Sequence, residues 1–415
     1  MAELIDIKEG FKNTKIGIVP IDWEVKVLGE VSNIFRGGSP RPIEAFITQD
    51  VDGVNWIKIG DVDKAAKYIY STKERISNRG VSFSRKVNDG DFLLSNSMSF
   101  GRPYILRTSG CIHDGWLVIQ DYQSTFNSDF LYYLLSFETT LNQYRTLAAG
   151  STVLNLNKEI VNKVYVQFPK IDEQNSVAQA LSDIDWLIVE QEKLIEKKRN
   201  IKQGAMQELL KPKQGWQEKF LGETATLKAR IGWQGLTTSE YRKTGEYYLI
   251  TGTEFKNGFI DWSSCYYVDE ERYKQDRNIQ VKAHDILVTK DGTIGKVALI
   301  KTVSKPATLN SGVFVIRPIA NSFHPEFFYY LLLSEIFLTF LSQLSAGSTI
   351  NHLYQKDFVT FKYFTPKSID EQKQVANVLW DMDSEIEELE AKLHKFKMVK
   401  QGMMQSLLTG KIRLV

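Results

Sequence analysis

The sequence predicts a mixed α/β protein of the α+β type, in which two tandem globular domains are each followed by a long helix. Three observations support this fold class. The chain of 415 residues repeats itself once. The first part of each copy alternates short β-branched and aromatic runs with Gly, Asn and Ser, and the last part has a seven-residue apolar repeat. The predicted segments are 1–168, 169–212, 213–365 and 366–415.

The internal repeat consists of motifs that recur in the same order, at an offset that drifts from about 192 to 198 residues. Trp23-Glu-Val-Lys-Val-Leu-Gly-Glu30 returns as Trp216-Gln-Glu-Lys-Phe-Leu-Gly-Glu223. Further repeated motifs are Phe130-Leu-Tyr-Tyr-Leu-Leu135, Ala149-Gly-Ser-Thr152, Asp172-Glu-Gln174 and Lys202-Gln-Gly-Ala-Met-Gln207, whose counterparts begin at Phe327, Ala346, Asp370 and Lys400. A match in order over such a span indicates two copies of one structural plan.

The globular part of each copy is predicted to contain mainly strands. Trp116–Ile119 and its counterpart Val313–Ile316 are short apolar runs of the kind that form buried strands. Apolar residues crowd more densely in Ser128–Ser136 and in Pro325–Leu333, which predicts one amphipathic helix per copy. The tyrosine pairs in these two helices favour packing in the core over stacking on nucleic-acid bases.

The last part of each copy is predicted to be one long helix, because Asp172–Leu210 and Asp370–Leu408 lack proline and turn residues. In the second, the stripe from Val375 to Leu407 is apolar at all positions but Lys400, and Ser368-Ile-Asp-Glu371 is a capping-box match at its start. The stripe of the first helix is interrupted at Gln191, Lys198 and Lys202.

Each of these helices needs a helical partner. A helix of about 39 residues is about 58 Å long, which exceeds the width of a small domain, so its stripe cannot be buried in its own globule. The two helices are therefore expected to form an antiparallel coiled coil that relates the two halves by an internal pseudo-two-fold axis. Two independent surface helices are the less favoured alternative.

Composition excludes several classes of protein. Hydrophobic residues make up 43% and charged residues 25%, which excludes a mainly disordered or membrane-embedded chain and favours a cytoplasmic protein. Cys111 and Cys265 are too few for a disulfide framework or a cysteine metal site. The net charge is only +2, and the four segments carry 0, −1, +3 and 0. If the chain binds nucleic acid, its basic groups must gather on one face, or another subunit must supply much of the attraction for phosphate.

Catalytic motifs are missing. Gly292-Thr-Ile-Gly-Lys296 has two residues between the glycines where a phosphate loop needs four, so a turn is predicted. Glu24-Val-Lys26 resembles the end of a nuclease triad, but the second copy lacks that spacing. The five histidines show no metal-ligand spacing. The sequence therefore predicts no catalytic residue, no metal site and no cofactor in this chain.

Polar loops at corresponding positions in the two copies offer groups that can read phosphates or base edges. Arg36-Gly-Gly-Ser-Pro-Arg41 is a flexible turn flanked by two guanidiniums. The candidate contact residues are Arg36, Arg41, Asn96, Ser97, Ser99, Arg102, Ser151, Thr152 and Asn155 in the first copy, and Lys228, Arg230, Thr289, Lys290, Thr293, Lys296, Ser348, Thr349, Asn351 and His352 in the second.

The order of these elements resembles the specificity subunit of Type I restriction-modification systems, over essentially the whole chain. The resemblance rests on the Trp…Leu-Gly-Glu opening of each copy, on Ala-Gly-Ser-Thr before each long helix, and on Asp-Glu-Gln and Lys-Gln-Gly-x-Met-Gln within it. It implies that the globular units are target recognition domains, that each reads one half of a split target in double-stranded DNA, and that the helices are a spacer on which two methyltransferase subunits dock. The resemblance also implies restriction subunits as further partners. It implies no association with a membrane.

The same resemblance implies a non-catalytic chain, with S-adenosylmethionine and ATP bound by partner subunits. A helical spacer of this length would fix the gap between two half-sites, and the divergence of the two domains implies an asymmetric target. Charged helix residues such as Glu190, Glu192, Lys197 and Arg199 are candidates for docking, with a solvated helix face as the alternative. The competing functions are a pseudo-dimeric protein adaptor that binds no nucleic acid and, less favoured, a modification enzyme that acts alone.

Overall fold

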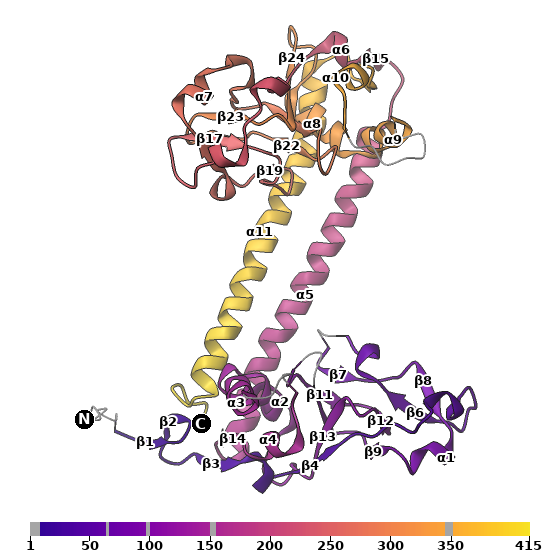
Figure 1. Cartoon of the computed structure of the whole chain (residues 1–415), viewed down its shortest axis with the longest axis vertical. Helices are drawn as coiled ribbons and strands as arrows, with labels where there is room; N and C mark the ends of the chain where they lie inside the picture. The colour runs from indigo at the N-terminus through magenta and orange to yellow at the C-terminus, as the bar shows by residue number, and fades with distance from the viewer. Residues whose placement is uncertain (1–8, 64–65, 97–99, 150–154, 345–351) are drawn as a thin grey trace. The chain divides into compact units, whose positions relative to one another are not determined.

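The computed structural model describes residues 9–63, 66–96, 100–149, 155–344 and 352–415, and its chain divides into two compact units. Unit 1 comprises Met1–Glu192 and Ala391–Val415, and unit 2 comprises Lys193–Glu390. Each unit contains one globular α/β domain and a portion of each of the two long helices, α5 (Ile171–Leu209) and α11 (Ile369–Leu407) (Figure 1). The predicted fold class is confirmed.

Two five-stranded sheets form most of the globular part of unit 1, as far as it is described. The first has the order β4 (Asn33–Arg36), β13 (Trp116–Gln120), β10 (Phe92–Ser95), β11 (Pro103–Leu106) and β7 (Tyr68–Ile69). The second has the order β5 (Ile47–Thr48), β8 (Glu74–Ile76), β6 (Val54–Ile57), β12 (Gly110–Ile112) and β9 (Arg85–Val87). Two-stranded sheets pair β1 (Phe11–Thr14) with β2 (Gly17–Pro20) and β3 (Glu24–Val27) with β14 (Tyr165–Phe168). The helices are α1 (Asn78–Val81), α2 (Ser128–Ser136), α3 (Glu138–Ala148) and α4 (Lys158–Asn162).

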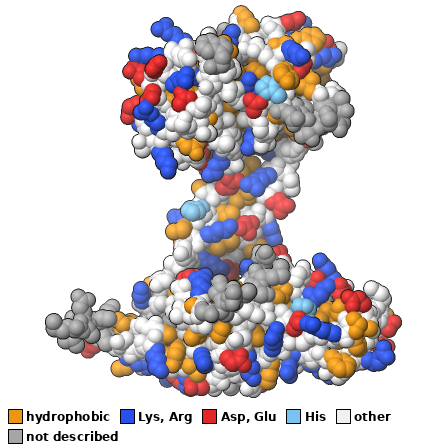
Figure 2. Space-filling model, viewed as in Figure 1, with side chains coloured by type: hydrophobic (Ala, Val, Ile, Leu, Met, Phe, Trp, Pro, Cys, Tyr) orange, Lys and Arg blue, Asp and Glu red, His pale blue; other side chains and the backbone are white. Residues whose placement is uncertain are grey.

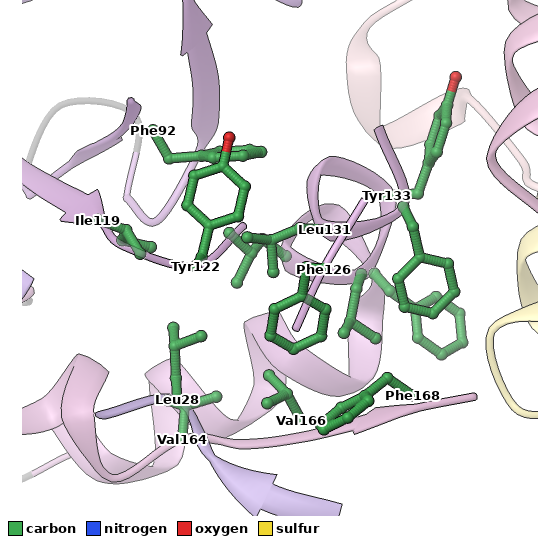
Figure 3. Packing of buried hydrophobic residues seen from close by; sticks show 14 of the residues in the cluster. Leu28, Phe92, Ile119, Tyr122, Phe126, Leu131, Tyr133, Val164, Val166 and Phe168 are labelled. Atoms are coloured by element: carbon green, nitrogen blue, oxygen red, sulfur yellow. The ribbon is translucent and has the colours of Figure 1, made fainter. Parts of the chain in front are cut away.

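The first sheet of unit 1 is buried on both faces, which explains why β10 reads as an unbroken apolar run. Phe92 and Leu94 join a cluster with residues of α2 and of both long helices, part of which Figure 3 shows. Leu93 points the other way and packs against Ile57 and Ile112 of the second sheet. Burial of each such side chain contributes about 1.5–3 kcal/mol to the free energy of folding. The buried sheet therefore holds in place the strand ends from which the polar loops extend.

Unit 2 repeats this plan. Its larger sheet has the order β16 (Ala225–Lys228), β24 (Val313–Pro318), β21 (Ile286–Thr289) and β22 (Val297–Leu299), which matches β4, β13, β10 and β11. The second sheet has the order β20 (Tyr266–Val268), β17 (Tyr247–Ile250) and β23 (Ala307–Leu309), and smaller sheets pair β15 (Gln217–Phe220) with β25 (Lys362–Thr365) and β18 (Phe255–Lys256) with β19 (Phe259–Ile260). The helices are α6 (Leu221–Thr224), α7 (Glu270–Lys274), α8 (Pro325–Leu333), α9 (Glu335–Leu344) and α10 (Gln355–Phe358).

Several elements lie where the sequence predicts them. Helices α2 and α8 have the predicted ends, and α5 and α11 each begin and end one residue before the predicted bounds. Ser368 Oγ accepts a hydrogen bond from the backbone N–H of Asp370 at 3.2 Å, so it serves the start of α11. Both cysteines are free and buried. The tyrosine pairs of α2 and α8 take part in core packing, as predicted.

Helices α5 and α11 pack together, and ion pairs give their direction within each unit. In unit 1, Asp185 pairs with Lys400 and Glu192 with Lys397, so the partner number falls along α11 as it rises along α5. Unit 2 shows the same order in the pairs Arg199–Glu390 and Lys202–Asp383. The two helices are therefore antiparallel in each unit, as the apolar stripes predict.

In the part of the chain that the structure describes, no single helix has both the length and the apolar character to cross a membrane. Helices α8 and α9 meet such criteria only when taken together, and they are bent by 59° at their junction.

Candidate nucleic-acid interface

Four backbone hydrogen bonds hold the described ends of the loop that follows the central strand of the first sheet in unit 1. Asn96 N–H donates to Gly115 O at 3.0 Å, and Asn96 O accepts from Leu156 N–H at 2.8 Å. Ser95 N–H donates to the carbonyl of Arg102 at 3.2 Å, and Ser95 O accepts from Gly101 N–H at 2.9 Å. These bonds join the ends of β10, β11 and β13 into one hydrogen-bonded edge. We call this edge the loop frame; in unit 1 it consists of Ser95, Asn96, Gly101, Arg102, Gly115 and Leu156.

Unit 2 has the same loop frame. Lys290 takes the place of Asn96, with its N–H donating to Gly312 O at 2.8 Å and its carbonyl accepting from Leu353 N–H at 2.9 Å. Thr289 N–H donates to Lys296 O at 2.9 Å, and Gly295 N–H donates to Thr289 O at the same distance. The two copies thus conserve the backbone of this edge and differ in the side chains that it carries.

A glycine in the left-handed region of backbone conformation closes each frame. Gly101 has φ +73° and Gly295 has φ +79°, values that other residues adopt only with strain. A Cβ at Gly295 would lie 2.3 Å from Leu341 Cδ1, and one at Gly101 would lie 2.7 Å from Tyr144 Cδ2. The segment Gly292–Lys296 is accordingly the tight connection between β21 and β22, in agreement with the predicted turn.

The loop frame of unit 1 carries a group of polar side chains around Asp114. Arg36 Nε donates to the backbone carbonyl of Asp114 at 3.3 Å, and Arg41 Nη2 lies 3.3 Å from Asp114 Oδ2. Ser39 Oγ donates to Asp114 Oδ1 at 3.0 Å, and Asn96 Nδ2 donates to the Asp114 carbonyl at 3.1 Å. Both predicted arginines of the flexible turn are therefore tied to one residue.

Asp114 is held in its charged form. Burial raises the pKa of its carboxyl, but the neighbouring His113 and the hydrogen bonds from Ser39 and Arg41 outweigh that effect and hold the pKa below its usual value. A cavity of about 700 Å³ opens beside this group, lined by Arg41, Trp56 and Lys58 among others. The site can present fixed guanidinium donors to an anion or to a base edge.

The loop frame of unit 2 carries small hydroxyl groups and lysine in place of arginine. A cavity of about 320 Å³ there is lined by Thr251, Thr293, Lys296 and Ser311 among others. Thr289, one of the predicted contact residues, is buried; its Oγ1 donates to Thr293 O at 2.6 Å and accepts from Lys296 N–H at 2.9 Å. Thr289 therefore shapes the loop, while Thr293 and Lys296 are exposed.

Two further predicted residues of unit 2 lie beside this loop. Lys290 Nζ lies 5.4 Å from the ring centroid of Phe314, within the range of a cation–π contact. The Nδ1 atom of His352 pairs with Asp291 Oδ1. His352 thus shares the edge of the frame with Lys290 and with the exposed Asp291.

Arg230 was predicted to contact DNA, and the structure corrects this prediction. Its side chain is buried, with Nε donating to Leu309 O at 2.9 Å, Nη1 to Gln275 Oε1 at 2.9 Å, and Nη2 to Thr308 Oγ1 at 3.2 Å. These donors are used inside the domain, where a guanidinium must be hydrogen-bonded to offset its burial, so they are not available to DNA. Its neighbour Lys228 is exposed at the end of β16.

The remaining predicted residues divide into two groups. Asn155 is exposed, and the guanidinium of Arg102 lies 5.8 Å from the ring centroid of Tyr104. The others lie outside the described residues: Ser97, Ser99, Ser151, Thr152, Ser348, Thr349 and Asn351.

Sequence reasoning missed Asp114, the residue on which the site of unit 1 is centred. Asp114 lies in the loop before β13, and the repeat aligns Gly115-Trp116 with Gly312-Val313, which places Asp114 opposite Ser311. Because β13 pairs with both β4 and β10, the loop that precedes it must lie beside the turn after β4 and the loop after β10. This pairing is a property of the tertiary structure, so residue spacing along the chain carries no signal for it.

A second repeated feature explains two of the polar interruptions in the helix stripes, Lys202 and Lys400. In unit 1, Tyr133 Oη donates to Asp185 Oδ2 at 2.7 Å, and Lys400 Nζ lies 2.5 Å from Asp185 Oδ1. In unit 2, Tyr330 Oη donates to Asp383 Oδ2 at 2.8 Å, and Lys202 pairs with the same carboxylate. We call each Tyr–Asp–Lys set a polar latch, because it joins the globular domain to both long helices.

Helix charges proposed for docking are partly used within the helix pair. Glu192 pairs with Lys397 at 2.7 Å, and Arg199 pairs with Glu390 at 2.6 Å. Large apolar side chains are exposed on the same helices, including Trp186 at 63% and Met398 at 56%. A helix surface of this kind is suited to binding another protein.

Charge is dispersed on the face that Figure 2 shows, as far as its residues are described. On the face shown in Figure 2, lysine and arginine side chains alternate with acidic ones over both units and do not gather in one broad basic patch. Among the residues described, no group of three or more His, Cys, Asp or Glu is arranged to hold a metal ion. The two polar loop frames, one on each copy of the duplicated α/β fold, are therefore the candidate interface.

Comparison with known proteins agrees with this duplication. A family model described as the Type I restriction modification DNA specificity domain matches residues 20–202 and again 213–395. The chain is 24% identical, over 434 aligned positions that cover 98% of it and 97% of the relative, to the Type I restriction enzyme MjaVIII specificity subunit of Methanocaldococcus jannaschii.

Solved structures share the fold over nearly the whole chain. The Type I restriction-modification S subunit of M. genitalium gives a TM-score of 0.58 at 15% identity and covers 93% of this chain and 96% of its own. A chain from a structure describing complex assembly and conformational transition of a Type I system gives 0.63 at 15% identity, covering 95% and 99%.

Fold and loops together define a protein with two tandem recognition domains on paired helices. The chain belongs to the Type I restriction-modification DNA specificity family: it is a specificity subunit, the non-catalytic subunit that recognises the DNA target of the complex. The alternatives of a protein adaptor and of an independent modification enzyme are set aside by this membership.

Proposed function

We propose that the chain reads an asymmetric, bipartite target in double-stranded DNA, with 1–168 and 213–365 as the target recognition domains and one half-site for each. The observation that carries this proposal is the loop frame, which has the same backbone in both units and different side chains. Arginine donors are tied to Asp114 in unit 1, whereas unit 2 offers threonine hydroxyls and Lys296. Different donor sets select different base edges, so the two half-sites are expected to differ.

Two methyltransferase subunits are proposed to dock on the helical segments 169–212 and 366–415. The exposed indole of Trp186 supports an apolar contact, because aromatic side chains frequently anchor protein interfaces. In such an assembly S-adenosylmethionine and ATP belong to the partner subunits, including a restriction subunit where the system has one. The complex is proposed to act on DNA in the cytoplasm.

The docking proposal can be tested by pulling down the methyltransferase with variant chains. Trp186→Ala is expected to reduce its recovery at least tenfold, while Tyr70→Ala, which truncates a comparably exposed aromatic residue of a globular domain, leaves recovery unchanged. Equal recovery with both variants would contradict an interface at Trp186.

The nearly balanced charge of the chain supports a division of labour in DNA binding. With a net charge of +2, the isolated chain is expected to bind DNA weakly, because phosphate attraction supplies most non-specific affinity. The complex with methyltransferase is expected to bind tightly, with a steep dependence on salt. A footprint of equal strength from the isolated chain would contradict this.

The decisive experiment maps methylated bases in cells that express this chain with its methyltransferase. Wild type is expected to give a split motif, and replacing 1–168 by the corresponding domain of a relative is expected to change one half of that motif only. A continuous motif, or a change in both halves, would refute the assignment of one half-site to each unit.

A further inference from the structure

The turn between β4 and the second sheet brings two exposed arginines to one residue, Asp114: Arg36 to its backbone carbonyl and Arg41 to its carboxylate. Arg36 and Arg41 stand at the ends of the turn, and each uses one donor on Asp114. A guanidinium has five N–H donors, so most of those on each arginine stay available. The Arg41 side chain is 82% exposed, which leaves its outer edge accessible to a ligand.

The turn itself is held against the ends of the strands. Gly37 N–H donates to Trp116 O at 2.8 Å, and Gly38 N–H donates to Ile112 O at 3.1 Å. A Cβ at Gly37 would lie 2.1 Å from the carbonyl oxygen of His113, so only glycine permits this close approach. The backbone that carries both arginines is therefore positioned before any ligand binds.

Asp114 is in turn fixed from its other side. Its Oδ1 accepts from Ser39, and its carbonyl accepts from Asn96, so Oδ2 is the oxygen that faces Arg41. Orienting a long side chain in advance reduces the entropy that is lost on binding. Asp114 is thus placed to act as a positioning residue, which touches the arginines and not the ligand.

Guanine is the base whose major-groove edge matches such a donor fork, because its O6 and N7 are adjacent acceptors. The described residues of unit 2 do not form this arrangement. Its counterpart of Asp114 is Ser311, and the guanidinium of Arg230 is used inside the domain. We propose that Asp114 orients Arg36 and Arg41 to read guanine in the half-site of unit 1, an inference that rests on the proposed function.

The test uses the complete complex with methyltransferase and a set of duplexes in which each base pair of the split motif is replaced in turn. Arg41→Ala is expected to lower discrimination at one G·C pair of a single half-site by about 5- to 150-fold, the range for one bidentate contact. Asp114→Asn, which keeps the size of the side chain and removes its charge, is expected to relax the same position to a smaller extent.

Two control variants separate base reading from general effects. Arg145→Ala removes another exposed arginine of unit 1, on α3, and Ser311→Ala changes the counterpart of Asp114. Neither is expected to alter discrimination at the affected pair. The Arg41→Ala substitution lies on the surface, so the fold is expected to persist.

A phosphate contact is the alternative role of Arg41. In that case Arg41→Ala would weaken methylation of all duplexes equally and reduce the salt dependence, and this result would overturn the proposal. Absence of guanine from the half-site that a swap of 1–168 changes would also overturn it. Failure of the proposed function can be told apart from failure of this inference, because the wild-type complex would then methylate a continuous motif.

Discussion

The polar latches allow a quantitative prediction, because the described residues form one in each unit and the two differ in burial. In unit 2 the side chains of Lys202 and Asp383 are 17% and 20% exposed, and in unit 1 those of Lys400 and Asp185 are 29% and 30% exposed. Breaking a fully buried ion pair destabilises a protein by about 3–5 kcal/mol, whereas exposed pairs contribute about 0–1 kcal/mol. The two latches lie between these limits.

Methionine is the suitable replacement for either lysine, because it keeps the length of the apolar stem and a similar helix propensity. Lys202→Met is expected to destabilise unit 2 by about 2 kcal/mol, since it leaves a largely buried Asp383 carboxylate with Tyr330 Oη as its remaining latch partner. Lys400→Met is expected to destabilise unit 1 by about 1 kcal/mol, because Asp185 is better solvated.

Hydrogen exchange followed by peptide mass spectrometry measures these effects locally, which a two-unit chain requires. Protection of α8 should fall about 30-fold in Lys202→Met and protection of α2 about 5-fold in Lys400→Met. In a double-mutant cycle, Tyr330→Phe should cost about 1 kcal/mol alone and more in the Lys202→Met background, because it then removes the remaining latch partner of a largely buried carboxylate. Unchanged protection of α8, or equal losses in both units, would refute this reasoning.

Three further predictions concern other parts of the chain. Hydrogen bonds from Arg413 lower the pKa of Asp22. The ionised carboxylate therefore stabilises unit 1 fully above its unfolded pKa of about 3.8, and this contribution is lost as the pH falls through the lowered pKa. Thermal unfolding between pH 2 and 6 should show this acid loss in wild type and much less of it in Asp22→Asn. Gly295→Ala should destabilise unit 2 more than Gly292→Ala in urea unfolding. Both glycines have positive φ, but only a Cβ at Gly295 would lie 2.3 Å from Leu341 Cδ1. Equal effects of the two substitutions would contradict the packing argument. Inserting one heptad, about 10.5 Å, into both α5 and α11 preserves their register and should widen the gap in the methylated motif by about three base pairs, whereas an unchanged gap would rule out a helical spacer.

Local patterns were sufficient where the physics is local. The ends of α2 and α8 follow from the density of apolar residues, and those of α5 and α11 from continuous stripes without proline. The pairing of α5 with α11 also follows, because a long helix with an apolar stripe requires a partner. Burial and hydrogen bonding depend on segments far apart in the chain, and here sequence reasoning failed for Arg230 and overlooked Asp114.

By itself the sequence determined the duplication, the fold class and the family, because each depends on order and periodicity along the chain. Only the tertiary structure decided which polar groups act together. Lys202 and Lys400 interrupt apolar stripes in the sequence, but in space each is paired with a carboxylate and lies beside a tyrosine. Asp114 joins Arg36 and Arg41 because strand pairing brings three loops to one edge, and such proximity has no signature in residue spacing.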